Sequence, residues 1–522
     1  MIRLRKYFLS FPASEKGRFA GQQAGFRDLE KKRFSGLSAC RMALFAQAFF
    51  FAAFTALAAL TLAGCSEEQE EPGKSEYTIT FDAAGGSPIP SPVQVKAGGK
   101  IAEPDEVPSN GDLIFSGWFT SSGEKFNFNI SEASSDLTLY AKWWEGPRQF
   151  IFINGIDLEF HYARIRNWFG SQVGKDIAIG QSFILYCFER PREVMLSNLE
   201  KHLAQSLEFE IPVLVQLDAV TFMDARPDLW NWWDPAGEGY DPANKNNVEW
   251  TSWSDDDAVK LGWLNWGQQI RLNPMPNLMS PEYRQAVDEQ MGEFIEIVMD
   301  WYENLPADKK WLFAGIKSTG EMAIGVNNWY YPGGNSYLDQ DPANDPQTGI
   351  NMYDFPSRGV QTIGYAALKT GGIKSSGLIT GDDIAQLARK HSEIVSKLCA
   401  DHGVPRELVF AHAGGAGKDL EACLNEYACP SWSFYGAAAT QPKNFNEALS
   451  LLESSDAPYF GIAEWSVGAP TDPRQWSGPI EEGLSIPKCR FLSIYANVVG
   501  SDLFHRSPNM AAVEGIKTVQ SN

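Results

Sequence analysis

The sequence predicts an α/β protein made of a (β/α)8 barrel, the TIM barrel, with a small all-β module in front of it. Eight short runs rich in Val, Ile and Phe alternate with amphipathic helical patterns, which is typical of parallel strands joined by crossover helices. These runs extend over roughly 350 residues, the size of such a barrel. No GxGxxG or P-loop motif follows any of them, so a nucleotide site lacks support. A doubly wound open sheet is the alternative.

The expected barrel elements follow one another in a regular order. The strand-like runs are 150–156, 177–186, 211–220, 311–321, 407–414, 430–436, 459–465 and 490–496. Ser280 and Pro281 mark the start of a long amphipathic helix, and Thr380 with Asp383 forms a capping box before another. Two insertions follow the third and fourth runs, at 221–279 and 322–379. Both lengthen the carboxyl ends of strands, where active sites of such barrels lie.

The amino-terminal part of the chain has the pattern of a targeting signal. Residues 42–65 form an apolar run that ends in Leu-Ala-Gly-Cys. The run resembles a bacterial lipoprotein signal, which implies lipidation of Cys65 and removal of residues 1–64. A transmembrane anchor is the alternative, and Met42 is an alternative start. The charged segment 65–75 predicts an acidic tether.

An acidic run behind a lipidated cysteine also resembles signals that send lipoproteins to the cell surface in some Gram-negative bacteria. A solvated spacer is the plainer interpretation of the same charges. We therefore expect a protein of the bacterial cell envelope, at the outer membrane and exposed on the cell surface. Its only membrane contact would be the lipid anchor.

The tether leads into residues 76–144, where short apolar strands alternate with Gly, Pro and Asn turns. The motifs TITFDAAGG, FSGWFT and LTLYAKW occur there in order. Together they resemble the Listeria/Bacteroides repeat of bacterial surface proteins, a β-grasp-like module, which implies a spacer or adhesion role. The expected division is then completed by a catalytic barrel at 148–505 and a carboxyl-terminal tail at 506–522.

The composition of the chain limits the kinds of molecule that we expect it to bind. The net charge of −21 argues against nucleic acid or an anionic membrane face as the main partner. The 17 tryptophans exceed what a core of this size needs, and aromatic rings often line sites for sugar rings. Five cysteines follow Cys65 at scattered spacing, and no HExxH motif occurs, so neither a disulfide framework nor a metal site is expected. No cofactor is expected either.

Polar side chains end several of the apolar runs. They are Asp218, Glu321, His412, Tyr435 and Glu464. A carboxylate at the end of an apolar strand loses favourable hydration, so it is expected there only if it pairs with another polar group or takes part in function. Two glutamates on one rim can serve as the acid and the nucleophile of glycoside hydrolysis.

Glu321 ends the fourth run and Glu464 the seventh. This placement resembles the superfamily of retaining glycoside hydrolases with (β/α)8 barrels, the clan A-like enzymes. The resemblance implies that Glu321 is the acid/base, that Glu464 is the nucleophile and that Tyr435 hydrogen-bonds the nucleophile. Gly320 departs from the usual Asn before the acid/base, and the usual Trp is missing near Tyr495. TGEMAIGVNNWYYP also resembles the strand-four motif of β-amylases, which are inverting.

Aromatic residues crowd the two insertions among Asp, Asn and Glu. We expect Trp233, Trp250 and Trp266 to contribute sugar-binding faces, and we expect the same of Trp465, which lies beside the proposed nucleophile. The alternative is that the rings pack the loops against the barrel.

The other polar residues at the strand ends have two interpretations each. Asp218 would bind a sugar hydroxyl or cap a loop, and His412 would contact the ligand or serve the structure. Arg190 would clamp the nucleophile or pair with Glu189. The expected function is hydrolysis of a β-linked oligosaccharide or polysaccharide. The alternative is a non-catalytic surface protein that binds glycans.

Overall fold

The computed structural model describes residues 74–111, 113–260, 262–265, 269–321, 326–327, 361–495 and 509–521. The signal at 1–64, Cys65 and Trp266 lie outside these residues, as does most of the tether. None of the helices in the described part of the chain is long and apolar enough to cross a membrane.

The amino-terminal module is a four-stranded sheet with the order β2-β1-β4-β3. Its strands are β1 (Glu76–Asp82), β2 (Val93–Lys96), β3 (Ile114–Phe119) and β4 (Leu137–Trp144). β1 and β4 pair in parallel, and the other pairs are antiparallel. The apolar residues of the motifs point to one side, where Ile79, Phe81, Trp118 and Leu139 form the core. Burial therefore explains why these residues recur at every second position.

Eight parallel strands close into the expected barrel, in the order β10-β13-β14-β15-β16-β5-β6-β7. Their bounds in chain order are β5 (Gln149–Ile156), β6 (Ile177–Tyr186), β7 (Val213–Asp218), β10 (Phe313–Lys317), β13 (Val409–Ala413), β14 (Cys429–Tyr435), β15 (Phe460–Ser466) and β16 (Cys489–Tyr495). Closure leaves no free edge in this sheet. It also brings the carboxyl ends of all eight strands to one rim.

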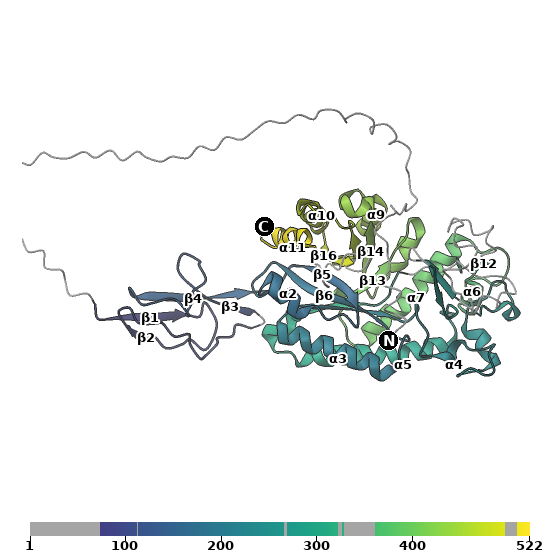
Figure 1. The fold of residues 1–522 in the computed structure, drawn as a ribbon, viewed down its shortest axis with the longest axis horizontal. Helices are drawn as coiled ribbons and strands as arrows, with labels where there is room; N and C mark the ends of the chain where they lie inside the picture. Colours follow the sequence, from purple (N-terminus) through teal and green to yellow (C-terminus); the bar gives the residue numbers. More distant parts are fainter. Residues whose placement is uncertain are drawn as a thin grey trace, which may run out of the picture.

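Helices surround the barrel and bury their apolar faces on it (Figure 1). The longer helices are α2 (Tyr162–Phe169), α3 (Arg192–Phe209), α5 (Pro281–Asn304), α7 (Gly381–Asp401), α9 (Asn446–Ser454), α10 (Arg474–Leu484) and α11 (Met510–Ser521). Ser280 caps α5 and the Thr380–Asp383 box caps α7, as the sequence predicts. Helix α11 buries Ala512, Val513 and Ile516. That part of the range 506–522 therefore belongs to the helical layer and is not a tail.

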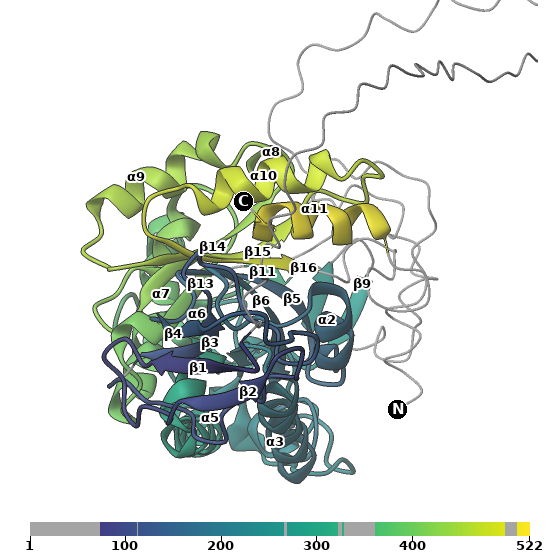
Figure 2. The same ribbon diagram turned by 90° about the vertical axis from the view of Figure 1, so that its left-hand side faces the viewer.

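The module packs against the barrel at the amino ends of the strands. Ile114 and Trp144 share an apolar cluster with Leu305, at the end of α5, and with Trp311 and Leu312, which directly precede β10. The rings of Trp144 and Trp311 lie 5.2 Å apart, edge to face. The module therefore covers the end of the barrel opposite to the rim where the strands finish (Figures 1 and 2).

The insertions lie at that rim. The first holds α4 (Pro227–Trp230) and a hairpin of β8 (Gly262–Asn265) and β9 (Gln269–Leu272), and the second holds α6 (Tyr365–Thr370). The Glu249 carboxylate accepts the backbone N–H groups of Gly364, Ala366 and Ala367 at the start of α6. One insertion therefore caps a helix of the other.

Candidate functional site

The two glutamates meet at the open rim of the barrel. Donor oxygens of Glu321 and Glu464 and a ring nitrogen of His412 all lie within 4.8 Å of one another. Glu321 follows β10, His412 lies in β13 and Glu464 lies in β15. Strand pairing brings them together, because β10, β13, β14 and β15 are consecutive neighbours in the sheet although they are far apart in the sequence.

Glu464 lies inside β15 and is 8% exposed. It is paired in register with Ser433 of β14, and the register between these strands shifts just before that pair. Such irregularities are common beside active sites, where they redirect a side chain. Tyr435, the last residue of β14, donates its hydroxyl to a Glu464 carboxylate oxygen. This is the contact that the sequence resemblance implies for the nucleophile.

Glu321 lies four residues beyond β10, which ends at Lys317 rather than at the glutamate. Its side chain is exposed to solvent at the rim. One face of it lies against Gly414, directly after β13. A Cβ atom on Gly414 would stand 2.5 Å from Oε1 of Glu321 and 2.7 Å from its carboxyl carbon. The glutamate can hold this position only because residue 414 has no side chain.

The departure at Gly320 has a physical reason. A Cβ atom there would lie 2.6 Å from Oδ2 of Asp218. The same Oδ2 accepts a hydrogen bond of 2.8 Å from the Thr221 hydroxyl, and Oδ1 accepts the backbone N–H groups of Val220 and Thr221. Asp218 therefore caps the loop after β7, the second of the two roles that the sequence leaves open. An Asn at position 320 would displace this cap.

A chain of hydrogen bonds connects His412 through Ser433 to Glu321. The His412 Nε2 atom lies 2.8 Å from the Ser433 hydroxyl, and that hydroxyl also hydrogen-bonds the Glu321 side chain. His412 is fully buried, and burial lowers its pKa well below the usual value, so its ring is neutral. Because it is closed off from solvent, it acts on the site through Ser433, which corrects its prediction as a ligand contact.

Among the residues that the structure describes, Lys317 is the cation beside the two glutamates. It is fully buried inside the barrel, and its Nζ donates to the carbonyl oxygen of Ala463 at 3.1 Å, the residue before Glu464. Burial lowers the pKa of Lys317 to about 8, while both glutamates act in the opposite direction. The sequence signal for this residue is a lysine at the end of the apolar run FAGIK.

The surroundings act differently on the pKa values of the two carboxyl groups. Although the Glu321 side chain is exposed, its carboxyl group lies among protein atoms. This desolvation and the negative charge of Glu464 raise the pKa of Glu321 to about 7, against the opposing effects of Ser433 and Lys317. Burial also raises the pKa of Glu464, but the Lys317 ammonium and the Tyr435 hydroxyl oppose this rise, and Asp218 adds to it. Two adjacent carboxyls with a cation nearer to one of them favour a single shared proton. The arrangement favours that proton on Glu321.

The same three residues have the donor types of a metal site. Carboxylate oxygens and a neutral imidazole are ordinary ligands of divalent ions, and Glu321, His412 and Glu464 are the group of the described residues with suitable spacing. Lys317 already places a positive charge beside this group. The expectation that no metal is needed stays a prediction.

The structure corrects two of the tryptophan predictions. Trp465 is fully buried, donates from Nε1 to the Ala439 carbonyl oxygen and packs against Trp476. Trp250 is 5% exposed and donates to the Lys245 carbonyl oxygen. Neither ring offers a face to a ligand, because both contribute to packing. The half-buried Trp233 lines a cavity of about 230 Å³ with Trp230 and remains a candidate.

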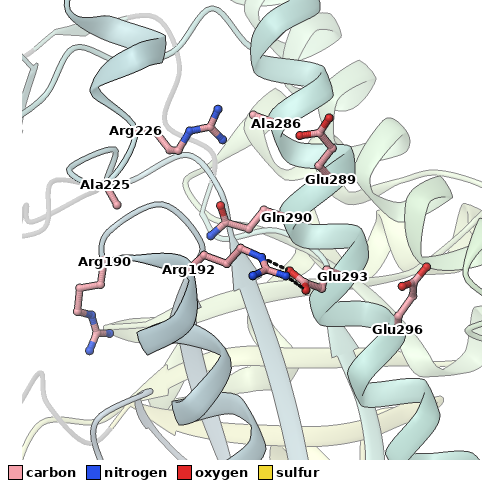
Figure 3. Close-up of a pocket in the computed structure, with 9 residues that line it drawn as sticks. All are labelled: Arg190, Arg192, Ala225, Arg226, Ala286, Glu289, Gln290, Glu293 and Glu296. Atoms are coloured by element: carbon pink, nitrogen blue, oxygen red, sulfur yellow. Dashed lines mark hydrogen bonds and ion pairs between the residues drawn. The ribbon is translucent and has the colours of Figure 1, made fainter. Parts of the chain in front are cut away.

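A larger cavity of about 630 Å³ lies outside the barrel, between α3 and α5 (Figure 3). Arg190, Arg192 and Arg226 line it, and neither glutamate of the site does. Arg190 pairs with the fully buried Asp157 and with Glu189. It therefore does not clamp the nucleophile, and its pairing with Glu189 is the alternative that holds.

Together these observations define a (β/α)8-barrel protein with two carboxyl groups at the carboxyl-terminal rim and a repeat module at the other end. Residues 77–142 match the model of the Listeria-Bacteroides repeat domain. A "Putative Gly-rich membrane protein" of Evansella cellulosilytica is 38% identical over 71 residues, which cover 13% of this chain and 8% of that protein. The chain thus spans less than a tenth of the length of this curated relative.

Solved structures are similar in the barrel. A glycoside hydrolase family 5 enzyme from Prevotella bryantii B14 matches with a TM-score of 0.34 and 9% identity, over 72% of this chain and 96% of that one. The catalytic domain of a β-amylase from Paenibacillus polymyxa matches with a TM-score of 0.38 and 10% identity, over 72% and 99%. At these TM-scores and identities the matches describe the course of the chain only and give no information about a reaction.

Proposed function

We propose that the chain is a glycoside hydrolase that cleaves a β-linked oligosaccharide or polysaccharide with retention of configuration. The observation that carries the proposal is the approach of the Glu321 and Glu464 oxygens to within 4.8 Å at an open barrel rim. Carboxyls of retaining enzymes lie about 5 to 5.5 Å apart, whereas inverting enzymes keep roughly 6.5 to 9.5 Å to admit a water molecule. The short separation therefore favours double displacement.

The protonation pattern supports the assignment of roles. In the first step the Glu464 carboxylate attacks the anomeric carbon, and the bond to the leaving oxygen breaks as Glu321 transfers its proton to that oxygen. In the second step Glu321 removes a proton from water, and the hydroxide attacks the anomeric carbon and releases Glu464. Tyr435 and Lys317 stabilise the carboxylate before attack and after release.

The test is hydrolysis of aryl β-glycosides and of plant, host and bacterial glycans by the full chain in detergent. We expect Glu321→Gln to lose about 10²- to 10⁴-fold in kcat on substrates with poor leaving groups. Glu464→Gln should abolish turnover on all substrates. The configuration of the first product, followed by NMR, distinguishes retention from inversion. Glycan binding without any hydrolysis by the wild type would instead favour a binding protein.

We also propose that Cys65 carries a lipid anchor and that the chain works at the outer surface of the cell envelope. The Leu-Ala-Gly-Cys ending and the acidic segment behind it support this. The module stands between this anchor and the barrel and packs at the end opposite to the glutamates, which would turn the site away from the membrane. Metabolic labelling with a fatty acid should mark the wild type and not Cys65→Ser. Protease accessibility on intact cells tests exposure.

A further inference from the structure

Lys317 is an unusual residue to find where it lies. It is among the largest fully buried side chains of the described residues, in the middle of the barrel. An ammonium group without an anionic partner is costly to bury, even after its surroundings relax. Within the described part of the chain, its Nζ hydrogen-bonds a neutral group, the Ala463 carbonyl oxygen. The compensating charge must therefore act through space.

Two carboxylates supply that charge. Glu464 and Glu321 are the charged groups that act on Lys317, and Glu464 has the stronger effect. The hydrogen bond to Ala463 places the ammonium next to the backbone of Glu464 itself. Lys317 also acts on His412 of the neighbouring strand β13, which helps to keep that ring neutral. Other groups that face the pair are the hydroxyl of Tyr435, Asp218 from β7, Tyr186 from β6 and Tyr495 from β16.

Among the side chains that the structure places around the pair, Lys317 is thus the cation in a ring of acids, phenols and a neutral imidazole. We propose that Lys317 is a positioning residue that keeps Glu464 as the anion of the pair and thereby leaves the proton on Glu321. This inference rests on the proposed function, because it explains how two adjacent glutamates take different roles in one reaction. Lys317 touches neither the substrate nor the reacting atoms.

The test separates this inference from the proposed function. Lys317→Met keeps the approximate length of the side chain and removes the charge. Lys310→Met is the matched control, since Lys310 is a half-buried lysine that donates to the Glu303 carbonyl oxygen near the amino ends of the strands. Glutamate labelled with ¹³C at the carboxyl carbon reports the titration of Glu464 by NMR without any substrate, and Glu464→Gln assigns the signal.

In Lys317→Met we expect the titration midpoint of Glu464 to rise by at least about one pH unit, a tenfold change in the ionised fraction. The acidic limb of the kcat/KM profile should move by the same amount. Lys310→Met should leave both midpoints in place, and Lys317→Arg should restore the wild-type limb. An unchanged Glu464 midpoint in a folded Lys317→Met would overturn the inference, even with hydrolysis intact. A shifted midpoint without hydrolysis by the wild type would support the electrostatic role and reject the proposed reaction.

A reciprocal measurement covers the case in which Lys317→Met does not fold. Coupling between two ionisable groups is symmetric. Glu464→Gln should therefore lower the midpoint of Lys317, followed by ¹³Cε-labelled lysine NMR, by the same amount of at least about one unit. A Lys317 midpoint that does not respond to Glu464→Gln would refute the inference equally well.

Discussion

Replacing Gly414 by alanine should slow catalysis because it displaces the carboxyl group of Glu321. The added Cβ would lie 2.5 Å from Oε1 of Glu321, whereas ordinary contacts of such atoms begin at 3.4 Å. The carboxyl group must then move by nearly 1 Å. A misplacement of this size can cost about 100-fold in rate. Gly414 does not have a positive φ angle, so alanine brings no backbone strain.

The assay compares two aryl glycosides that differ in leaving-group acidity. A displaced acid/base should reduce kcat about 100-fold for the poor leaving group, which needs the proton, and much less for the good one. The control is Gly381→Ala, because a Cβ atom at Gly381 meets nothing within 4 Å. Equal kcat values for Gly414→Ala and wild type on the poor leaving group, with the melting temperature unchanged, would refute the role given to Glu321.

Three further predictions concern stability and binding. Burial raises the pKa of Glu249 from 4.5 to about 7, so the folded chain holds this proton more tightly than the unfolded chain. The protonated Glu249 therefore contributes fully to the free energy of unfolding below pH 4.5, and this contribution is lost as the pH rises towards 7. Urea unfolding should show the loss, up to about 3 kcal/mol, in the wild type relative to Glu249→Gln. Parallel plots of unfolding free energy against pH for the two proteins would contradict the prediction. Trp465→Ala should destabilise the chain by about 3 to 5 kcal/mol because the ring is fully buried; a loss below 1 kcal/mol in the same assay would show that the ring is not packed as described. Trp233→Ala should leave the unfolding free energy nearly unchanged but weaken glycan binding severalfold in calorimetry, and equal affinity would remove Trp233 from the site.

Much of the architecture could be predicted from the sequence because it follows from local patterns. Buried parallel strands read as continuous apolar runs, and each of the eight predicted runs overlaps a strand of the closed barrel. The capping box at Thr380 and the start of α5 depend only on residues close together in the chain. Helix α11 was missed because it follows the last strand of the barrel. Its apolar residues become informative only against α10.

The sequence by itself also determined that Glu321 and Glu464 would be neighbours, because parallel strands of one barrel end at a common rim. Only the tertiary structure decided their environment. Lys317 and Ala463 are 146 positions apart, and Gly414 matters only through its contact with Glu321. The tryptophans show the same limit, since the sequence does not reveal that Trp465 is fully buried whereas Trp233 is half-buried. Periodicity reveals which residues are buried, whereas the groups that they meet across the barrel depend on chain closure over long distances.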